Sequence, residues 1–370
     1  MNNWNFKNNT TKDAITGYED VMDKLKEYTK ERYLPLDEND RAKMVDEIFN
    51  VYREKNIFPI YYYNQNGIVK EIKKCIDKDV DFKEGTLDLK FNQGSSLCKY
   101  LFPNLHKVDA KVKNNTMIDR FYDDHKLKRA IDFSLRFKKS VTPSEIRTSL
   151  EMIGGNVATN FKPMVAKALY EKYVPKNGII LDSSSGFGGR MLGALSSKNN
   201  YTYIGTEPCT ETFANLNTLG SEIEKVTGRT NSFKVVCKGS EDFNLGKEYF
   251  DFSFTSPPYF TLEMYSDEET QSTIKFPTLE EWIDGFVKPT IKNNYDMLKK
   301  GSYYAINIAD FNIGSNRVEF VDKWIELCEE IGFEYVERID MKLTTRRGNG
   351  HNIDGVDKKK EEGIYIFKKN

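Results

Sequence analysis

A short run of polar and aromatic residues around two consecutive prolines is the part of the sequence best suited to chemistry. The run consists of Thr255, Ser256, Pro257, Pro258 and Tyr259. Two prolines cannot continue a hydrogen-bonded ladder, and they stiffen the chain into an extended turn. The Ser256 hydroxyl and the peptide oxygen before Pro258 then have fixed directions. Together they can accept hydrogens from an exocyclic NH2 group and aim its lone pair at an electrophile. Tyr259 offers a flat face for stacking a base.

A glycine-rich turn lies earlier in the chain. It follows the apolar stretch that ends at Asp182, and it contains Gly186, Gly188 and Gly189, which allow a sharp turn and close approach of a ligand. The next apolar stretch ends at Glu207, where a carboxylate can accept hydrogen bonds from two ribose hydroxyls. The same pair of features also fits a dinucleotide enzyme. A glycine-rich turn can equally be plain structure.

A third acidic position follows a later apolar stretch. Asp242 lies in the segment Lys238–Phe243, directly after residues with strand character. Its carboxylate can accept a hydrogen bond from an adenine amino group. Ser240 or Asp242 can alternatively cap the amino end of a helix. The pattern alone leaves both interpretations open.

Short apolar strands separated by helical material must position these residues. The strands are expected at Gly178–Asp182, Tyr201–Gly205, Phe233–Cys237, Phe250–Thr255 and Tyr303–Ile308. An amphipathic helix is expected at Pro163–Tyr173, and Glu334–Leu343 and Ile364–Phe367 are expected to pair antiparallel at an edge. This alternation predicts a doubly wound, mainly parallel α/β sheet. Ligands of such sheets bind beyond the carboxyl ends of the strands, where the candidate residues fall.

The first part of the chain has a different pattern. Residues 1–145 are polar and helical in periodicity, with Asp37 placed to cap one helix. The aromatic run Phe58–Tyr63 follows that helix, and it fits a core better than a ligand site. The expected division is a helical region over 1–145, which can recognise a target, and a catalytic domain over 146–370.

These residues resemble the amino-methyltransferase family of DNA methyltransferases, which make N4-methylcytosine or N6-methyladenine. Thr255–Tyr259 resembles the family's catalytic motif IV, (Asp/Asn/Ser)-Pro-Pro-(Tyr/Phe/Trp), and this is the specific element. Four other segments support it by position: Asp182–Gly188 resembles motif I, Glu207 motif II, Asp242 motif III and Asn160–Pro163 motif X. The resemblance covers roughly residues 145–370. Ser183 and Ser184 replace the usual Pro-Phe of motif I, which puts the packing of a cofactor there in doubt.

The resemblance implies a class I, Rossmann-like methyltransferase sheet that uses S-adenosylmethionine. It implies a catalytic role for Ser256, Pro257, Pro258 and Tyr259. It implies cofactor contacts for Phe161, Asp182, Gly186, Gly188, Glu207, Asp242 and Thr255. The expected reaction is methyl transfer to an exocyclic amino group of a base flipped out of duplex DNA, and it needs no cysteine nucleophile. The serine in motif IV slightly favours cytosine N4 over adenine N6.

Several alternatives remain beside this hypothesis. The same chemistry can act on a base in structured RNA. An NAD-dependent oxidoreductase can use the glycine turn and Glu207, but it leaves Thr255–Tyr259 unexplained. A nucleic-acid-binding protein with a vestigial cofactor pocket is a further possibility, although an intact motif IV argues against decay. The sequence does not indicate an oligomeric state, and a partner restriction nuclease is an expectation from the resemblance alone.

Composition limits the class of protein. The chain has 370 residues, 39% of them hydrophobic and 13% aromatic, which excludes a disordered class. Its net charge of −1 means that nucleic-acid binding needs a local basic surface. Residues 107–167 contain 13 Lys and Arg against 7 Asp and Glu, and Lys342, Arg346, Arg347 and His351 offer another basic stretch.

The remaining patterns point to a cytoplasmic protein without a metal. The five cysteines are far apart and only three histidines exist, so no metal-ligand spacing occurs. The amino terminus lacks the apolar core of a signal peptide, and no apolar run approaches the roughly 18 residues of a membrane span.

Overall fold

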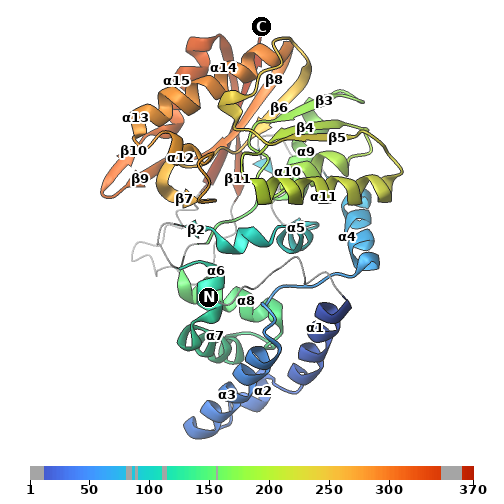
Figure 1. Cartoon of the computed structure of the whole chain (residues 1–370), viewed down its shortest axis with the longest axis vertical. Helices are drawn as coiled ribbons and strands as arrows, with labels where there is room; N and C mark the ends of the chain where they lie inside the picture. The colour runs from blue at the N-terminus through green and yellow to red at the C-terminus, as the bar shows by residue number, and fades with distance from the viewer. Residues whose placement is uncertain (1–11, 81–85, 88–90, 111–114, 156, 343–360) are drawn as a thin grey trace. The chain divides into compact units, whose positions relative to one another are not determined.

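The computed structural model describes residues 12–80, 86–87, 91–110, 115–155, 157–342 and 361–370 (Figure 1). The chain forms two compact units. The helical unit comprises Met1–Ile68 and Pro103–Thr159, and the sheet unit comprises Val69–Phe102 and Asn160–Asn370.

An eight-stranded sheet forms the centre of the sheet unit. Its order is β1 (Thr86–Leu87), β11 (Phe333–Lys342), β12 (Glu361–Lys369), β8 (Leu298–Ile308), β6 (Phe250–Thr255), β3 (Ile179–Asp182), β4 (Thr202–Thr206) and β5 (Phe233–Val236). Only β12 runs antiparallel to its neighbours in these pairings. The strand order reverses at β3, since β4 and β5 lie on one side of it and β6 and β8 on the other. The carboxyl ends of β3 and β6 therefore flank the switch point at which doubly wound sheets bind ligands.

This topology confirms the predicted fold class. The chain has the predicted doubly wound, Rossmann-like α/β sheet, and each of the five strands expected from the sequence is present within a few residues. The antiparallel pairing of the last two strands is also confirmed. Their place at the edge is wrong, because β12 lies between β8 and β11, and β1 pairs with β11 on its other side. Strand order depends on contacts distant in sequence, which a local pattern does not contain.

Two groups of helices accompany the sheet (Figure 1). The first group contains α9 (Pro163–Tyr173), α10 (Gly189–Leu195) and α11 (Thr210–Thr227). The second contains α12 (Ser272–Lys275), α13 (Leu279–Trp282), α14 (Lys288–Met297) and α15 (Phe320–Ile331). A buried cluster that includes Leu181, Trp282, Ile306 and Trp324 joins sheet and helix residues in one core. This apolar packing holds the strand ends in place.

The sheet unit also includes a segment from the amino-terminal half of the chain. This segment carries most of α4 (Gln65–Asp77) and all of α5 (Ser95–Leu101). The buried Lys167 of α9 donates to the carbonyl oxygens of Cys75, Ile76 and Lys78 at 2.9, 3.1 and 2.7 Å. These bonds satisfy carbonyl groups at the end of α4 that have no partner within the helix. The two units are therefore built from interleaved stretches, and not from a single division near residue 145.

Helices dominate the described part of the helical unit. They are α1 (Lys12–Leu25), α2 (Lys30–Tyr33), α3 (Glu38–Lys55), α6 (Met117–Tyr122), α7 (Asp124–Phe137) and α8 (Pro143–Gly154). The predicted cap is confirmed, since the Asp37 carboxylate accepts from the Asp40 N–H at 2.9 Å. The aromatic run after α3 is mostly core: Phe58, Tyr62 and Tyr63 are buried and Tyr61 is exposed.

Candidate active site

A buried ion pair holds the glycine turn in place. Asp182, the last residue of β3, is fully buried, and its carboxylate accepts from Arg190 Nε at 2.8 Å and from a terminal guanidinium nitrogen at 3.2 Å. The Tyr203 hydroxyl donates to the same carboxylate at 2.8 Å. Arg190 lies on α10, so the pair joins the strand to the helix across the turn. A direct cofactor contact of Asp182 stays a prediction, because these protein partners engage both of its oxygens.

The three glycines of the turn have different surroundings. Gly186 has φ +53°, and a Cβ there would meet nothing closer than the Ser184 carbonyl oxygen at 3.8 Å. At Gly188, with φ +75°, a Cβ would lie 2.6 Å from the Phe102 ring, so this glycine serves protein packing. At Gly189 a Cβ would lie 2.0 Å from the Phe161 carbonyl oxygen. Gly186 is therefore the position of the three where the backbone borders open space.

The segment that resembles motif X lies against this turn. Asn160 Nδ2 donates to the Phe187 carbonyl oxygen at 2.7 Å. The Phe161 ring packs edge-on against Phe254 of β6, with centroids 5.1 Å apart and planes at 81°. Residues far apart in sequence thus meet at the carboxyl ends of β3 and β6, as the cofactor prediction for Phe161 requires.

Glu207 connects the tip of β4 to the same turn. Its carboxylate accepts from the Gly186 N–H and from the Cys209 N–H, each at 3.0 Å. Burial raises the pKa of Glu207 to about 7, against the opposite effect of these two N–H groups. Each carboxylate oxygen still has a second lone pair available to a hydroxyl donor. Glu207, for which the sequence predicted a ribose contact, thus lies beside Gly186.

The loop after β5 differs from expectation. Asp242 has 58% of its side chain exposed, and its carboxylate pairs with Lys275 Nζ at 2.7 Å. Its neighbour Glu241 has only 4% exposed and pairs with the same lysine at 2.5 Å. Gly239 makes room for Glu241, since a Cβ there would lie 2.2 Å from that carboxylate. The sequence missed Glu241 because its partner Lys275 lies 34 positions further along the chain, and only the tertiary structure brings the two together.

The alternative role of this loop as a helix cap is wrong. Gly239 occupies the cap position of the short helix η3 (Ser240–Asp242), and no side chain caps it. The Ser240 hydroxyl instead shares a hydrogen bond of 2.6 Å with Thr290 on α14. The adenine contact of Asp242 stays a prediction.

The double-proline corner emerges beside the glycine turn. Strand β6 pairs in parallel with β3, with Ile180 opposite Phe252 and Leu181 opposite Ser253. The residues that follow, Thr255–Tyr259, therefore leave the sheet next to the residues that follow Asp182. This adjacency is the geometric condition on which the predicted chemistry depends.

Ser256 has a partner that the sequence did not indicate. Its hydroxyl donates to Asn307 Oδ1 at 3.5 Å, and Asn307 Nδ2 donates to the Gly363 carbonyl oxygen at 3.0 Å. Asn307 is buried near the carboxyl end of β8, the strand beside β6. The Gly363 carbonyl on β12 thus orients the Asn307 amide, whose oxygen accepts from the Ser256 hydroxyl.

Two buried hydroxyls at neighbouring strand ends lack partners. Ser183 is the residue after β3, and Thr255 is the last residue of β6. Neither Ser183 Oγ nor Thr255 Oγ1 has a hydrogen-bond partner within the described chain. Buried polar groups nearly always have partners, so such atoms suggest a bound group or water. The cofactor contact predicted for Thr255 is compatible with this observation.

Tyr259 packs at the exit of the corner. Its half-buried ring lies edge-on to Phe311, with centroids 6.2 Å apart. The next residue, Phe260, has φ +40°, a conformation that costs a non-glycine residue about 1–3 kcal/mol. Its ring is buried 5.6 Å from that of Trp282, and this packing holds the strained backbone.

The described residues contain no group of three His, Cys, Asp or Glu side chains suited to a metal ion. The five cysteines are free thiols, and Cys237 alone among them is exposed. No described helix is both long enough and apolar enough to cross a membrane.

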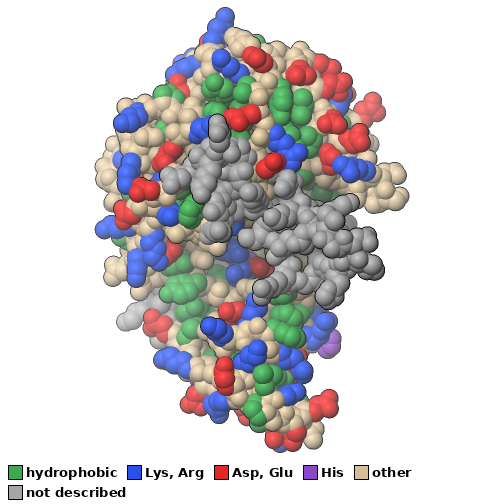
Figure 2. Space-filling model, turned by 180° about the vertical axis from the view of Figure 1, so that it is seen from behind, with side chains coloured by type: hydrophobic (Ala, Val, Ile, Leu, Met, Phe, Trp, Pro, Cys, Tyr) green, Lys and Arg blue, Asp and Glu red, His purple; other side chains and the backbone are tan. Residues whose placement is uncertain are grey.

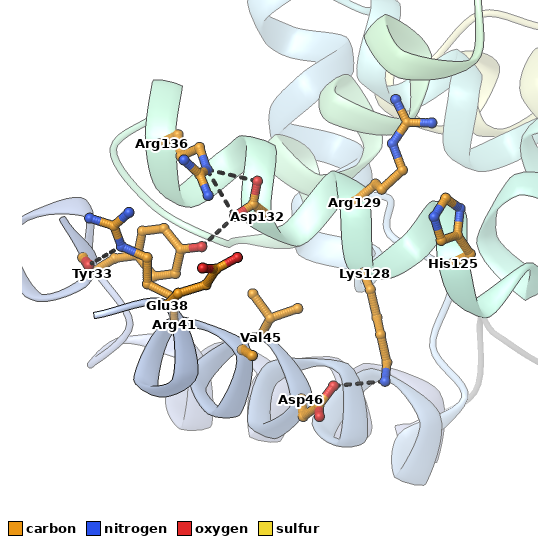
Figure 3. A pocket seen from close by; sticks show the side chains of 11 residues that line it. Tyr33, Glu38, Arg41, Val45, Asp46, His125, Lys128, Arg129, Asp132 and Arg136 are labelled. Carbon is orange, nitrogen blue, oxygen red and sulfur yellow. Dashed lines mark hydrogen bonds and ion pairs between the residues drawn. The ribbon is translucent and has the colours of Figure 1, made fainter. Parts of the chain in front are cut away.

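A groove of about 600 Å³ lies between α3 and α7 in the helical unit (Figure 3). Two of the basic side chains that line the groove are paired with acids: Lys128 pairs with Asp46 at 2.7 Å, and Arg136 pairs with Asp132 at 2.8 Å. Arg129 lines the same groove and is exposed.

Basic and acidic side chains are also intermixed on the face in Figure 2. Part of the basic excess over residues 107–167 is internal, because Lys167 and Arg120 are buried. Arg346, Arg347 and His351 of the other basic stretch lie outside the described residues, and so does the side chain of Lys342.

Comparisons with known proteins gave structural likeness only. No family model and no curated protein matches the chain. A TehB-like SAM-dependent methyltransferase from Corynebacterium glutamicum is 15% identical, with 58% of this chain and 90% of that chain covered and a TM-score of 0.36. A methyltransferase from Pyrococcus furiosus is 15% identical over 58% of this chain and 85% of its own, with a TM-score of 0.38. TrmN from Thermus thermophilus is 13% identical over 56% and 49%, with a TM-score of 0.35.

Proposed function

We propose that this chain transfers a methyl group from S-adenosylmethionine to an exocyclic amino group of a nucleic-acid base. The observation that carries the proposal is the pairing of β6 with β3, since the Ser-Pro-Pro-Tyr corner thereby leaves the sheet beside the glycine turn. Glu207, hydrogen-bonded to Gly186, is at the same turn. An NAD-dependent oxidoreductase would use the turn and the acid but would have no use for the corner.

The residues present fit the cofactor. The open side of Gly186 can admit a ligand to the backbone, and Glu207 retains lone pairs for ribose hydroxyls. The unpartnered hydroxyls of Ser183 and Thr255 can meet polar groups at the methionine end. The departure from the family at Ser183 thus adds a hydrogen-bonding group. When bound, the cofactor supplies a methyl group activated by positive charge on sulfur.

The corner can orient the attacking amine. Because the Ser256 hydroxyl donates its hydrogen to Asn307, its lone pairs remain to accept from an NH2 group. The Pro257 carbonyl oxygen can accept the second hydrogen. An amine held by these two acceptors would present its lone pair to the methyl group that the bound cofactor would supply, and it would lose its surplus proton to water. The protein contributes alignment in this mechanism, so no acid or base residue is required.

The proposed substrate is a base flipped out of duplex DNA, with Tyr259 as its stacking surface. The serine of the corner slightly favours cytosine N4 over adenine N6. In this proposal the helical unit recognises the target, and a cognate restriction nuclease is the expected partner.

The decisive experiment supplies the purified chain with S-adenosylmethionine labelled on the methyl group. Duplex DNA is expected to acquire label, and sequencing DNA from expressing cells with modified-base detection will identify base and context. Transfer to structured RNA but not to DNA would overturn the DNA assignment and keep the chemistry. Titration that detects binding of NAD but not of S-adenosylmethionine would overturn the proposal.

Replacing the stacking ring provides a test within the chain. Tyr259→Ala is expected to lower turnover about ten- to a hundredfold, because stacking of a base on an aromatic ring contributes about 1–3 kcal/mol. Its affinity for S-adenosylmethionine should stay near that of the wild type by calorimetry. Equal loss of turnover and cofactor affinity would show that the corner is only structural.

A further inference from the structure

The segment Phe260–Lys275 leads from the double-proline corner to the end of α12. We call this segment the strap. Its contacts reach residues that follow β3, β4 and β5, the three strands whose tips carry the proposed cofactor residues. The strap and the corner are continuous in the chain, so a constraint on one is passed directly to the other.

The contact at β4 is a helix cap supplied from a distance. The Glu268 carboxylate accepts from the Thr210 N–H at 3.0 and 3.2 Å and from the Thr210 hydroxyl at 2.8 Å. Cys209, at the cap position of α11, provides no side-chain cap of its own. The strap also donates from the Thr270 hydroxyl to the Pro208 carbonyl oxygen at 3.2 Å. A carboxylate is favourable at a helix amino terminus, where the N–H groups lack partners.

Glu268 and Glu207 act on the same helix end. The Cys209 N–H donates to Glu207, and the next N–H along the chain, that of Thr210, donates to Glu268. The strap is thus held one residue away from the proposed ribose-binding acid. Because the two carboxylates accept from neighbouring N–H groups, a displacement of Glu207 or of this helix end would also displace Glu268 and the strap.

Two further contacts hold the strap at the neighbouring strands. Lys275 Nζ bridges Glu241 and Asp242 after β5, at 2.5 and 2.7 Å. The Tyr265 ring contacts Phe187 of the glycine turn, with centroids 6.1 Å apart. The three contacts lie at the ends of adjacent strands, so the strap follows the edge of the sheet at which the cofactor is proposed to bind.

We propose that Glu268 and Lys275 are positioning residues that latch the strap over the cofactor site. Through the latch, the occupied cofactor site fixes the corner that receives the target base. This inference rests on the proposed function. It implies that the cofactor binds before the nucleic acid and leaves only when the latch opens. By linkage, a bound target base must then tighten cofactor binding by the same factor by which cofactor tightens the target.

The test measures release of S-adenosylmethionine from the full chain. Glu268→Ala is expected to release the cofactor about tenfold faster, because the variant loses charge-assisted hydrogen bonds that hold the strap. Asp267→Ala removes the adjacent exposed carboxylate and should leave the rate unchanged. Hydrogen exchange over Phe260–Lys275 is the second readout: cofactor should slow exchange in the wild type and in Asp267→Ala, but much less in Glu268→Ala.

Lys275→Ala opens the latch at the other end and should also release the cofactor faster. It keeps the test decisive if Glu268→Ala does not fold. If the wild type binds cofactor but release is unchanged in every folded latch variant, the strap has no latching role and the proposed function stands. If the wild type does not bind S-adenosylmethionine, the proposed function fails and the latch with it.

Discussion

At the scale of single residues, the two most informative groups are a carboxylate and a hydroxyl whose hydrogen bonds define what they can still accept. Glu207 is held by two backbone N–H groups, and Ser256 gives its only hydrogen to Asn307. Ionised Glu207 has no hydrogen to donate, and the hydrogen of Ser256 is already engaged. Both groups keep lone pairs that can accept a hydrogen bond. Each is therefore suited to a ligand that brings N–H or O–H donors.

The state of Glu207 predicts how cofactor affinity depends on pH. Its pKa is about 7, raised chiefly by burial. Ribose hydroxyls donate to the ionised carboxylate, so binding lowers this pKa, and affinity is full above about pH 7 and is lost as the pH falls below it. Calorimetric titration between about pH 5.5 and 8.5 measures this dependence.

Glu207→Gln tests the assignment of that dependence. The variant should bind S-adenosylmethionine about tenfold more weakly at high pH and show little dependence on pH. Ionisable groups within the described residues that interact with Glu207 include Asp182, Arg190, Cys209, Cys237 and Tyr265. A pH profile that survives unchanged in Glu207→Gln would assign the effect to one of these.

The serine–asparagine contact predicts a coupled effect on turnover. Asn307→Ala is expected to lower kcat about tenfold with unchanged cofactor affinity, since the hydroxyl then loses the acceptor that fixes its hydrogen. In a Ser256→Ala background the same change should have almost no further effect on kcat, because the contact no longer exists. Rate losses that simply add in the double variant would show that Asn307 does not act through Ser256.

At the scale of elements, the glycine turn depends on the ion pair that joins β3 to α10. Asp182 is 0% and Arg190 5% exposed, so removing one partner leaves an uncompensated buried charge. Arg190→Met is expected to lower the free energy of unfolding by about 3–5 kcal/mol in denaturant titration. Adding Asp182→Asn should restore part of the loss, because the buried charge is then removed. No recovery in the double variant would mean that shape, and not charge, accounts for the loss.

At the scale of the whole molecule, the net charge of −1 requires nucleic-acid binding to use a limited surface. The groove between α3 and α7 is one candidate in the helical unit, because Arg129 is exposed there while Lys128 and Arg136 are engaged by acids (Figure 3). A single phosphate contact contributes about one unit to the slope of log affinity against log salt.

Arg129→Glu is therefore expected to weaken duplex DNA binding and to reduce that salt slope by about one unit. Cofactor affinity should not change. Fluorescence anisotropy with a labelled duplex at several salt concentrations measures both quantities, and Lys128→Ala in the same groove serves as a comparison with a paired cation. An unaltered slope would place the phosphate contacts elsewhere on the chain.

The sequence by itself determined the elements and the types of residue at their ends. Apolar runs marked β3, β4, β5 and β6, and local chemistry marked the Asp37 cap and the glycine turn, because strand burial, capping and tight turns depend on residues close together in the chain. Tertiary structure alone decided which of those ends meet. Asn307 joins Ser256 across 51 positions, and Glu268 caps Thr210 across 58. Such contacts follow from strand order, which buried apolar packing selects and which a local pattern of residues does not encode.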